Sequence, residues 1–173
     1  LTVVASEDHS APTFGITVVY KVGFRLEPKG RTGFAHLFEH MMFQGTPNAA
    51  KGVYSRVIQA GGGVDNGSTR FDYTDYIASA PILWLEADRM RNLDFSEENL
   101  ANQQQVVMEE IRVNVKNQPY GGLAWIAPGL LIFDKWENAH DGYGSFADLE
   151  AAKVEDVRDF HRTYYAPNNA VVA

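Results

Sequence analysis

The sequence predicts an α+β fold, with a mixed, largely antiparallel sheet and helices layered on it. At 173 residues the chain has the length of one domain, and its 45% hydrophobic and 21% charged residues are ordinary for a globular protein. Segments of strand and helix character follow one another without the regular strand–helix–strand rhythm of a parallel sheet. No internal repeat or linker divides residues 1–173, which predicts a single core.

Two strands are expected near the start, over 2–6 and 14–24, because β-branched and aromatic residues dominate both segments. A polar loop then leads into the segment 32-TGFAHLFEHMMFQGT-46, which has helical character. Thr32 is expected to be its N-cap. Gly45 is expected to end the helix.

The middle of the chain predicts two more helices and one strand. Residues 49–60 have helical spacing and are followed by the glycines 61–63. A strand is expected over 68–79, which is rich in Thr, Tyr, Phe and Ile. Helical spacing returns over 81–92, where Pro81 occupies a favoured first position.

The last third predicts two helices separated by loops. Ser96 is placed to open a long helix over 97–117. Glycines and aromatic residues between 118 and 146 indicate loops. A helix is expected over 148–165, and a strand begins at Asn169.

Composition argues against several functions. The net charge is −7 and no cluster of Lys or Arg exists to meet phosphates, so we do not expect a nucleic-acid partner. The absence of cysteine excludes disulfides and thiolate metal ligands. No apolar run approaches about 18 residues, so we expect no membrane span.

His36, Glu39 and His40 are the polar residues of an otherwise apolar segment. Residues four apart lie on one face of a helix, so the two histidines could bind one cation, with Glu39 close enough to reach a water on it. The alternative is the solvated stripe of an ordinary amphipathic helix. The surrounding apolar residues favour the metal, because buried ionisable groups without partners are costly.

A catalytic zinc site needs a third protein ligand. Glu109 and Glu110 interrupt an apolar run in 106-VVMEEIRV-113. Glu110 interrupts the buried stripe of the expected helix, whereas Glu109 can be solvated or paired with Arg112. Glu110 is therefore the better candidate, although the pair could also be a plain helix edge.

The motif HxxEHxxFxGT, which begins at His36, resembles that of the pitrilysin-type zinc metallopeptidases, the inverzincins. This family includes insulin-degrading enzyme and the mitochondrial processing peptidases. Similar segments extend along nearly the whole chain: 23-GFRLEPKGRTGFAH-36, 61-GGGVDNGSTRFDYTDY-76, 106-VVMEEI-111 and 164-YYAPNNAVV-172.

The resemblance implies one Zn²⁺ per chain, held by His36, His40 and Glu110, with Glu39 as the general base that activates the water on the metal. It implies a peptide bound as an added strand beside Asn66, Gly67, Ser68 and Thr69. Two positions depart from the pattern. Gln103 stands where the family usually has an acidic residue, two turns before the third ligand, and Gly67 replaces the usual alanine.

The resemblance further implies that residues 1–173 are the N-terminal zinc-bearing domain of a longer chain, cut short at its C-terminal end. The implied function is a zinc metalloendopeptidase that hydrolyses peptides or unfolded segments. The alternatives are a non-catalytic homologous subunit, or a fragment that binds zinc and peptide but needs a second, homologous half for turnover. Family analogy favours the bacterial periplasm or cytoplasm. His140 and His161 fall outside the motif and are expected on a loop and on a helix surface.

Overall fold

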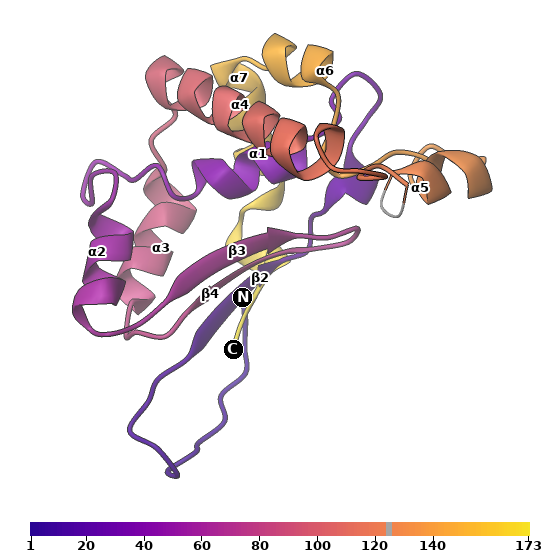
Figure 1. Ribbon diagram of the computed structural model, residues 1–173. Coiled ribbons are helices and arrows are strands. Elements are labelled where there is room, and N and C mark those ends of the chain that lie inside the picture. The colour runs from indigo at the N-terminus through magenta and orange to yellow at the C-terminus, as the bar shows by residue number, and fades with distance from the viewer. Residues whose placement is uncertain (124–125) are drawn as a thin grey trace.

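The computed structural model describes residues 1–123 and 126–173 as a sheet with helices layered on it (Figure 1). Its strands are β1 (Thr2–Val3), β2 (Ile16–Tyr20), β3 (Asp65–Thr69), β4 (Thr74–Ala78) and β5 (Ala170–Val172). The order across the sheet is β1-β5-β2-β4-β3. Only the β1–β5 pair among these strands is parallel. The expected fold class is confirmed, and β3 forms one edge of the sheet.

The helices gather mainly on one side of the sheet (Figure 1). They are α1 (Phe34–Met41), α2 (Val53–Ala60), α3 (Leu83–Asn92), α4 (Glu97–Ile111), α5 (Ala127–Ile132), α6 (Phe146–Ala151) and α7 (Val154–Tyr164). A π-helical turn (Arg112–Lys116) continues α4, and 3₁₀ turns lie at Phe24–Leu26 and Pro167–Asn169. Within the described ranges, no helix is both long and apolar enough to cross a membrane.

Helix α1 lies in the middle of the molecule and contacts α4, α7 and β3. Its apolar residues are spaced so that they share one face, which is buried. The buried residues of α1 are Phe34, Ala35, Leu37, Phe38 and Met41. They pack against Val18 and Tyr20 of β2, whose alternate side chains face the same core. This packing leaves the polar side of α1 half-buried, between β3 and α4.

The start of α1 differs from the prediction, because Thr32 is not the N-cap. Gly33 occupies that position with φ +84°, a left-handed conformation that glycine adopts readily. The first N–H groups of the helix are bound by the carboxylate of Glu27, which accepts from Gly33 N at 2.9 Å and from Ala35 N at 2.7 Å. The hydroxyl of Thr32 instead donates to Asp148 Oδ2. A carboxylate brought in by the preceding turn thus replaces the local cap.

The C-terminal end of α1 also lies earlier in the sequence than predicted. The helix ends at Met41, and Gly45 begins the next turn, with φ +95° and a bridge to Ala50. An added Cβ at Gly45 would overlap the backbone around Lys51, which explains a glycine there. Gly45 therefore shapes the loop after the helix rather than ending the helix itself.

The strand predicted over 68–79 is wrong as a single element. It is the hairpin of β3 and β4, whose turn is closed by a hydrogen bond from Arg70 N to Tyr73 O of 2.8 Å. The helix predicted over 148–165 is likewise two helices, α6 and α7. The chain is extended between them, and Lys153 N donates to Asp156 Oδ2 at the start of α7.

Three further boundaries moved. The predicted helix over 81–92 begins at Leu83, so Pro81 precedes it rather than opening it. The predicted helix over 97–117 opens at Ser96 as expected, since Ser96 Oγ accepts from Asn99 N, but its α-helical part ends at Ile111. The region from 118 to 146, expected to be loops, contains the short helix α5; residues 124–125 of that region lie outside the described part of the chain.

Candidate metal and catalytic site

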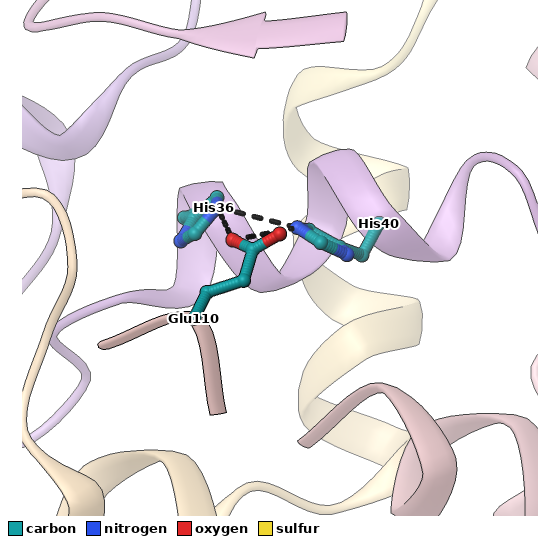
Figure 2. Close-up of side chains that lie close together, drawn as sticks. All are labelled: His36, His40 and Glu110. Carbon is teal, nitrogen blue, oxygen red and sulfur yellow. Dashed lines mark hydrogen bonds and ion pairs between the residues drawn. The ribbon is translucent and has the colours of Figure 1, made fainter. Parts of the chain in front are cut away.

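His36, His40 and Glu110 meet at one point between α1 and α4 (Figure 2). The Nε2 atoms of the two histidines lie 3.2 Å apart. Oε2 of Glu110 lies 3.3 Å from Nε2 of His36 and 3.6 Å from Nε2 of His40. The helical spacing aligns the histidines, and the packing of α4 against α1 brings in a carboxylate from 70 residues further along.

This donor set fits a zinc ion. Two imidazole nitrogens and a carboxylate oxygen are the ligand types of catalytic zinc sites. Zinc–ligand bonds of about 2.0–2.1 Å in a tetrahedron place neighbouring donors roughly 3.3–3.4 Å apart, close to the three distances between these atoms. The side chains are accessible as well, with exposed fractions of 14% for His36, 18% for His40 and 39% for Glu110. The three residues could therefore hold a metal and leave room for another ligand.

The local electrostatics favour positive charge at this point. Hydrogen bonds from His36 and His40 hold the pKa of the Glu110 carboxyl well below its usual range. Burial alone would lower the pKa of His40, but the carboxylates of Glu110 and Glu39 outweigh burial and raise it. Glu110 therefore keeps its negative charge, and the carboxylates that favour a proton on His40 also favour a bound cation.

A hollow of about 320 Å³ opens beside the three donors. It is lined by His36, Glu39, His40, Phe43, Asn66, Gly67 and Glu110. Glu39 thus faces the same space as the three donor side chains, and Asn66 and Gly67 of β3 also border it. Ser68, also expected in the substrate-binding segment, does not line the hollow, because its hydroxyl is turned to Asp75 Oδ1 at 2.6 Å.

The edge strand β3 presents backbone groups beside this hollow. Arg70 and Tyr73 form a hydrogen-bonded pair, and such pairs alternate along an antiparallel ladder. The N–H and C=O groups of Gly67 and Thr69 therefore point away from β4, toward the free edge of the sheet. Asn66 Oδ1 accepts the N–H of Gly67 at 2.9 Å, which is consistent with this direction.

Gln103 lies on α4, two turns before Glu110, and is buried. Its side chain helps to raise the pKa of His40, and its Nε2 donates to Asn102 Oδ1 at 2.8 Å. An amide oxygen can accept a ring N–H of histidine just as a carboxylate would. Gln103 therefore lies behind a candidate ligand, where the sequence led us to expect a supporting residue.

Sequence reasoning missed two contacts at the site. Thr69 Oγ1 donates to Glu39 Oε2 at 2.6 Å, a contact that depends on β3 crossing beside α1. Tyr143 lies edge-on to the ring of His36, with ring centroids 5.8 Å apart. Tyr143 comes from the loop before α6, and no sequence pattern signals that contact.

His140 lies on a loop, as expected, but it is buried, with its ring stacked on Trp136 and its Nε2 3.6 Å from Glu27 Oε2. His161 lies on α7 (Val154–Tyr164), as expected, but it is half-buried and packs its ring against Phe38. Burial lowers the pKa of His161, as expected for a ring in an apolar setting. Both residues support the core around α1 and lie outside the candidate site.

Comparison with known proteins matches residues 2–120 to the model of the insulinase family, peptidase family M16. The chain is 33% identical over 170 residues to the zinc protease PqqE of Helicobacter pylori, covering 91% of this chain and 36% of that protein. The crystal structure of a protease from Helicobacter pylori has a TM-score of 0.84 at 33% identity, covering 91% of this chain and 39% of that one.

A peptidase M16 inactive domain from Pseudomonas fluorescens has a TM-score of 0.87 at 19% identity, a likeness of fold alone; it covers 99% of this chain and 43% of that one. The chain spans little more than a third of the length of the curated relative PqqE.

Proposed function

The chain belongs to the insulinase family of peptidases, family M16, and from this premise we propose that it is the zinc-binding part of a metalloendopeptidase. His36, His40 and Glu110 hold the zinc ion, and Glu39 is the general base. The observation that carries the proposal is the convergence of Nε2, Nε2 and Oε2 within 3.2–3.6 Å, beside a hollow that Glu39 also faces.

Each residue has a chemical task in this proposal. When bound, zinc supplies a Lewis acid that polarises the peptide carbonyl and makes water easier to deprotonate. Glu39 takes the proton from the attacking water and passes it to the leaving amine. Gln103 orients the ring of His40 from behind.

The proposed substrate is an extended peptide, or an unfolded segment, that pairs with the free edge of β3. The outward C=O group of Gly67 and the outward N–H and C=O groups of Thr69 offer backbone hydrogen bonds of the kind an added strand makes. Asn66 lies on the same wall of the hollow and would bind the peptide backbone through its amide. Backbone pairing of this kind tolerates many sequences, because it does not depend on the substrate's side chains.

The test combines zinc content with cleavage of a quenched peptide, for the wild-type chain and for Glu39→Gln. We expect about one zinc ion per chain in both proteins, because Glu39 is not among the three donors. Cleavage should be lost in the variant, because an amide cannot act as the base. Absence of zinc after reconstitution with Zn²⁺ would disprove the site.

A narrower alternative concerns the chain by itself. Because it spans little more than a third of its relative PqqE, turnover could require a second, homologous half that encloses the substrate. Zinc binding without cleavage, restored when the remainder of the protein is added, would favour this alternative. A non-catalytic subunit is disfavoured, since His36, Glu39, His40 and Glu110 are all present and face one hollow.

A further inference from the structure

The hydroxyl of Thr69 holds the carboxylate of Glu39. Thr69 Oγ1 lies 2.6 Å from Glu39 Oε2, whereas the other acceptor in reach, the carbonyl of Ala35, lies at 3.5 Å. A hydroxyl has a single proton, and the shorter contact takes it. We propose that Thr69 is a positioning residue that fixes Glu39 for proton transfer, a role that rests on the proposed function of Glu39 as the base.

Gly67 confines the same carboxylate from the neighbouring position of β3. A Cβ added at Gly67 would lie 3.1 Å from Glu39 Cγ and 3.2 Å from Glu39 Oε1, which is closer than ordinary contact. Gly67 and Thr69 are two residues apart and so face the same side of the strand. The backbone at Gly67 therefore lies against one oxygen of the carboxylate, and the hydroxyl of Thr69 binds the other.

This restraint matters because a glutamate side chain has three rotatable bonds. Glu39 is only half-buried and borders the hollow, so without a partner its carboxylate would sample several rotamers. A general base acts only in those conformations that bring it within hydrogen-bond reach of the proton it removes. Fixing one rotamer raises the fraction of molecules that are ready to react.

Thr69 also links the base to the substrate-binding edge. Its side chain binds Glu39 on one side, while its own N–H and C=O face the free edge of β3. A peptide paired with that edge would therefore bind the backbone of the same residue whose side chain orients Glu39. The side chain is not needed for the backbone pairing, so its loss should affect the chemical step and spare binding.

The experiment measures kcat and KM of the full-length protein for a quenched peptide, with Thr69→Val and Thr69→Ser. Valine keeps the shape of threonine and removes the hydroxyl, whereas serine keeps the hydroxyl. We expect Thr69→Val to lower kcat about 10- to 100-fold, the scale of a misplaced catalytic group, with KM within about twofold. Thr69→Ser should recover most of the wild-type kcat, and both variants should retain zinc.

Two controls separate positioning from a general structural effect. Thr17→Val makes the same change at a half-buried strand position in β2 and should leave kcat unchanged. In a Glu39→Gln background, Thr69→Val should not reduce the residual rate further, because the two residues act together.

A wild-type kcat in Thr69→Val would overturn the role of Thr69 while leaving the proposed function intact. The role would also be overturned if Thr69→Val and Thr69→Ser lowered kcat equally. The same holds if Thr69→Val lowered kcat as much in the Glu39→Gln background as in the wild type. A wild-type protein that binds zinc and cleaves nothing would overturn the proposed function and this inference together.

Discussion

Replacing Glu27 by glutamine tests what holds the start of the metal-binding helix. Glu27 is buried, and its carboxylate binds the N–H groups of Gly33 and Ala35, which begin α1. On its other side His140 Nε2 lies at 3.6 Å. Glutamine has nearly the same shape but no charge, and it offers one oxygen where the carboxylate offers two. One of the two helix N–H groups must therefore face the new NH₂ group.

The cost of Glu27→Gln follows from these contacts. A buried N–H that loses its acceptor costs about 1–3 kcal/mol, and a hydrogen bond to a charged acceptor contributes about 1.5–3 kcal/mol. We therefore expect the variant to lose about 3 kcal/mol of unfolding free energy, which a domain with roughly 5–15 kcal/mol survives. With a urea m-value of about 2 kcal/mol/M, the midpoint should fall by roughly 1.5 M.

His140 makes the effect depend on pH. Its two ring nitrogens face the carbonyls of Trp136 and Phe24 at 2.7 and 2.6 Å, so both must carry a proton to bond them. Burial lowers the pKa of His140, but Glu27 and the two carbonyls outweigh it and raise the pKa to about 9. Burial in turn raises the pKa of Glu27, against the hydrogen bonds from His140 and the helix that lower it.

The sign of the pH effect is set by His140. A pKa raised from its ordinary 6.5 stabilises the fold fully below pH 6.5, and that contribution is lost as pH rises through about 9. The loss between pH 6.5 and pH 9 amounts to about 2–3 kcal/mol. In Glu27→Gln the neighbouring negative charge is gone, so the loss over this range should be smaller.

Urea denaturation followed by tryptophan fluorescence, at pH 6.5 and at pH 9, measures both effects. The difference in unfolding free energy between wild type and Glu27→Gln should be largest at pH 6.5 and should become smaller toward pH 9. If the wild type and the variant lost the same unfolding free energy between pH 6.5 and pH 9, Glu27 would not be what holds the proton on His140. A variant as stable as wild type at pH 6.5 would refute the capping role as well.

Three further predictions concern the candidate ligand, the backbone and the buried charge. Glu110→Ala should weaken zinc binding at least about 100-fold in a chelator competition, because it removes one of the three donors. Glu109→Ala should have little effect, because the carboxylate of Glu109 is exposed and paired with Arg112. A larger loss of zinc affinity in Glu109→Ala than in Glu110→Ala would refute the assignment. Gly23→Ala should destabilise the fold by about 3 kcal/mol or more in urea, because its Cβ would overlap the carbonyl oxygens of the turn after β3, whereas Gly15→Ala, which meets no atom within 4 Å, should be nearly neutral. Arg89→Met should cost about 3–5 kcal/mol of unfolding free energy in the same assay, because it leaves the buried carboxylate of Glu86 without its cationic partner. A loss below about 1 kcal/mol would contradict this.

The sequence predicted those parts of the site that depend on local geometry. The alignment of His36 with His40 follows from helical spacing alone. The choice of Glu110 over Glu109 followed from which face of the expected helix is apolar, and the structure turns Glu110 to the histidines and Glu109 to Arg112. The assignment of these residues as zinc ligands stays a prediction until metal is measured.

The parts that failed depend on contacts between distant segments. Thr32 is a good N-cap by residue type, yet Glu27 occupies the helix start because the preceding 3₁₀ turn carries its carboxylate there. The turn between β3 and β4 was missed because Phe71 and Tyr73 have strand-forming side chains, although the chain reverses between Arg70 and Tyr73. Propensity describes the single residue, whereas the turn is fixed by pairing along the whole ladder.

The hairpin error explains why the partner of Glu39 was not foreseen. If one strand ran over 68–79, Thr69 would lie near its start, with no reason to face α1. With the turn at Arg70–Tyr73, β3 becomes the edge strand and crosses the polar side of α1. The side-chain positions of Gly67 and Thr69 then face Glu39, whereas their backbone N–H and C=O groups face the free edge of the sheet. The position of the turn thus decides whether Gly67 and Thr69 contact Glu39 and also form the strand edge proposed to bind the substrate.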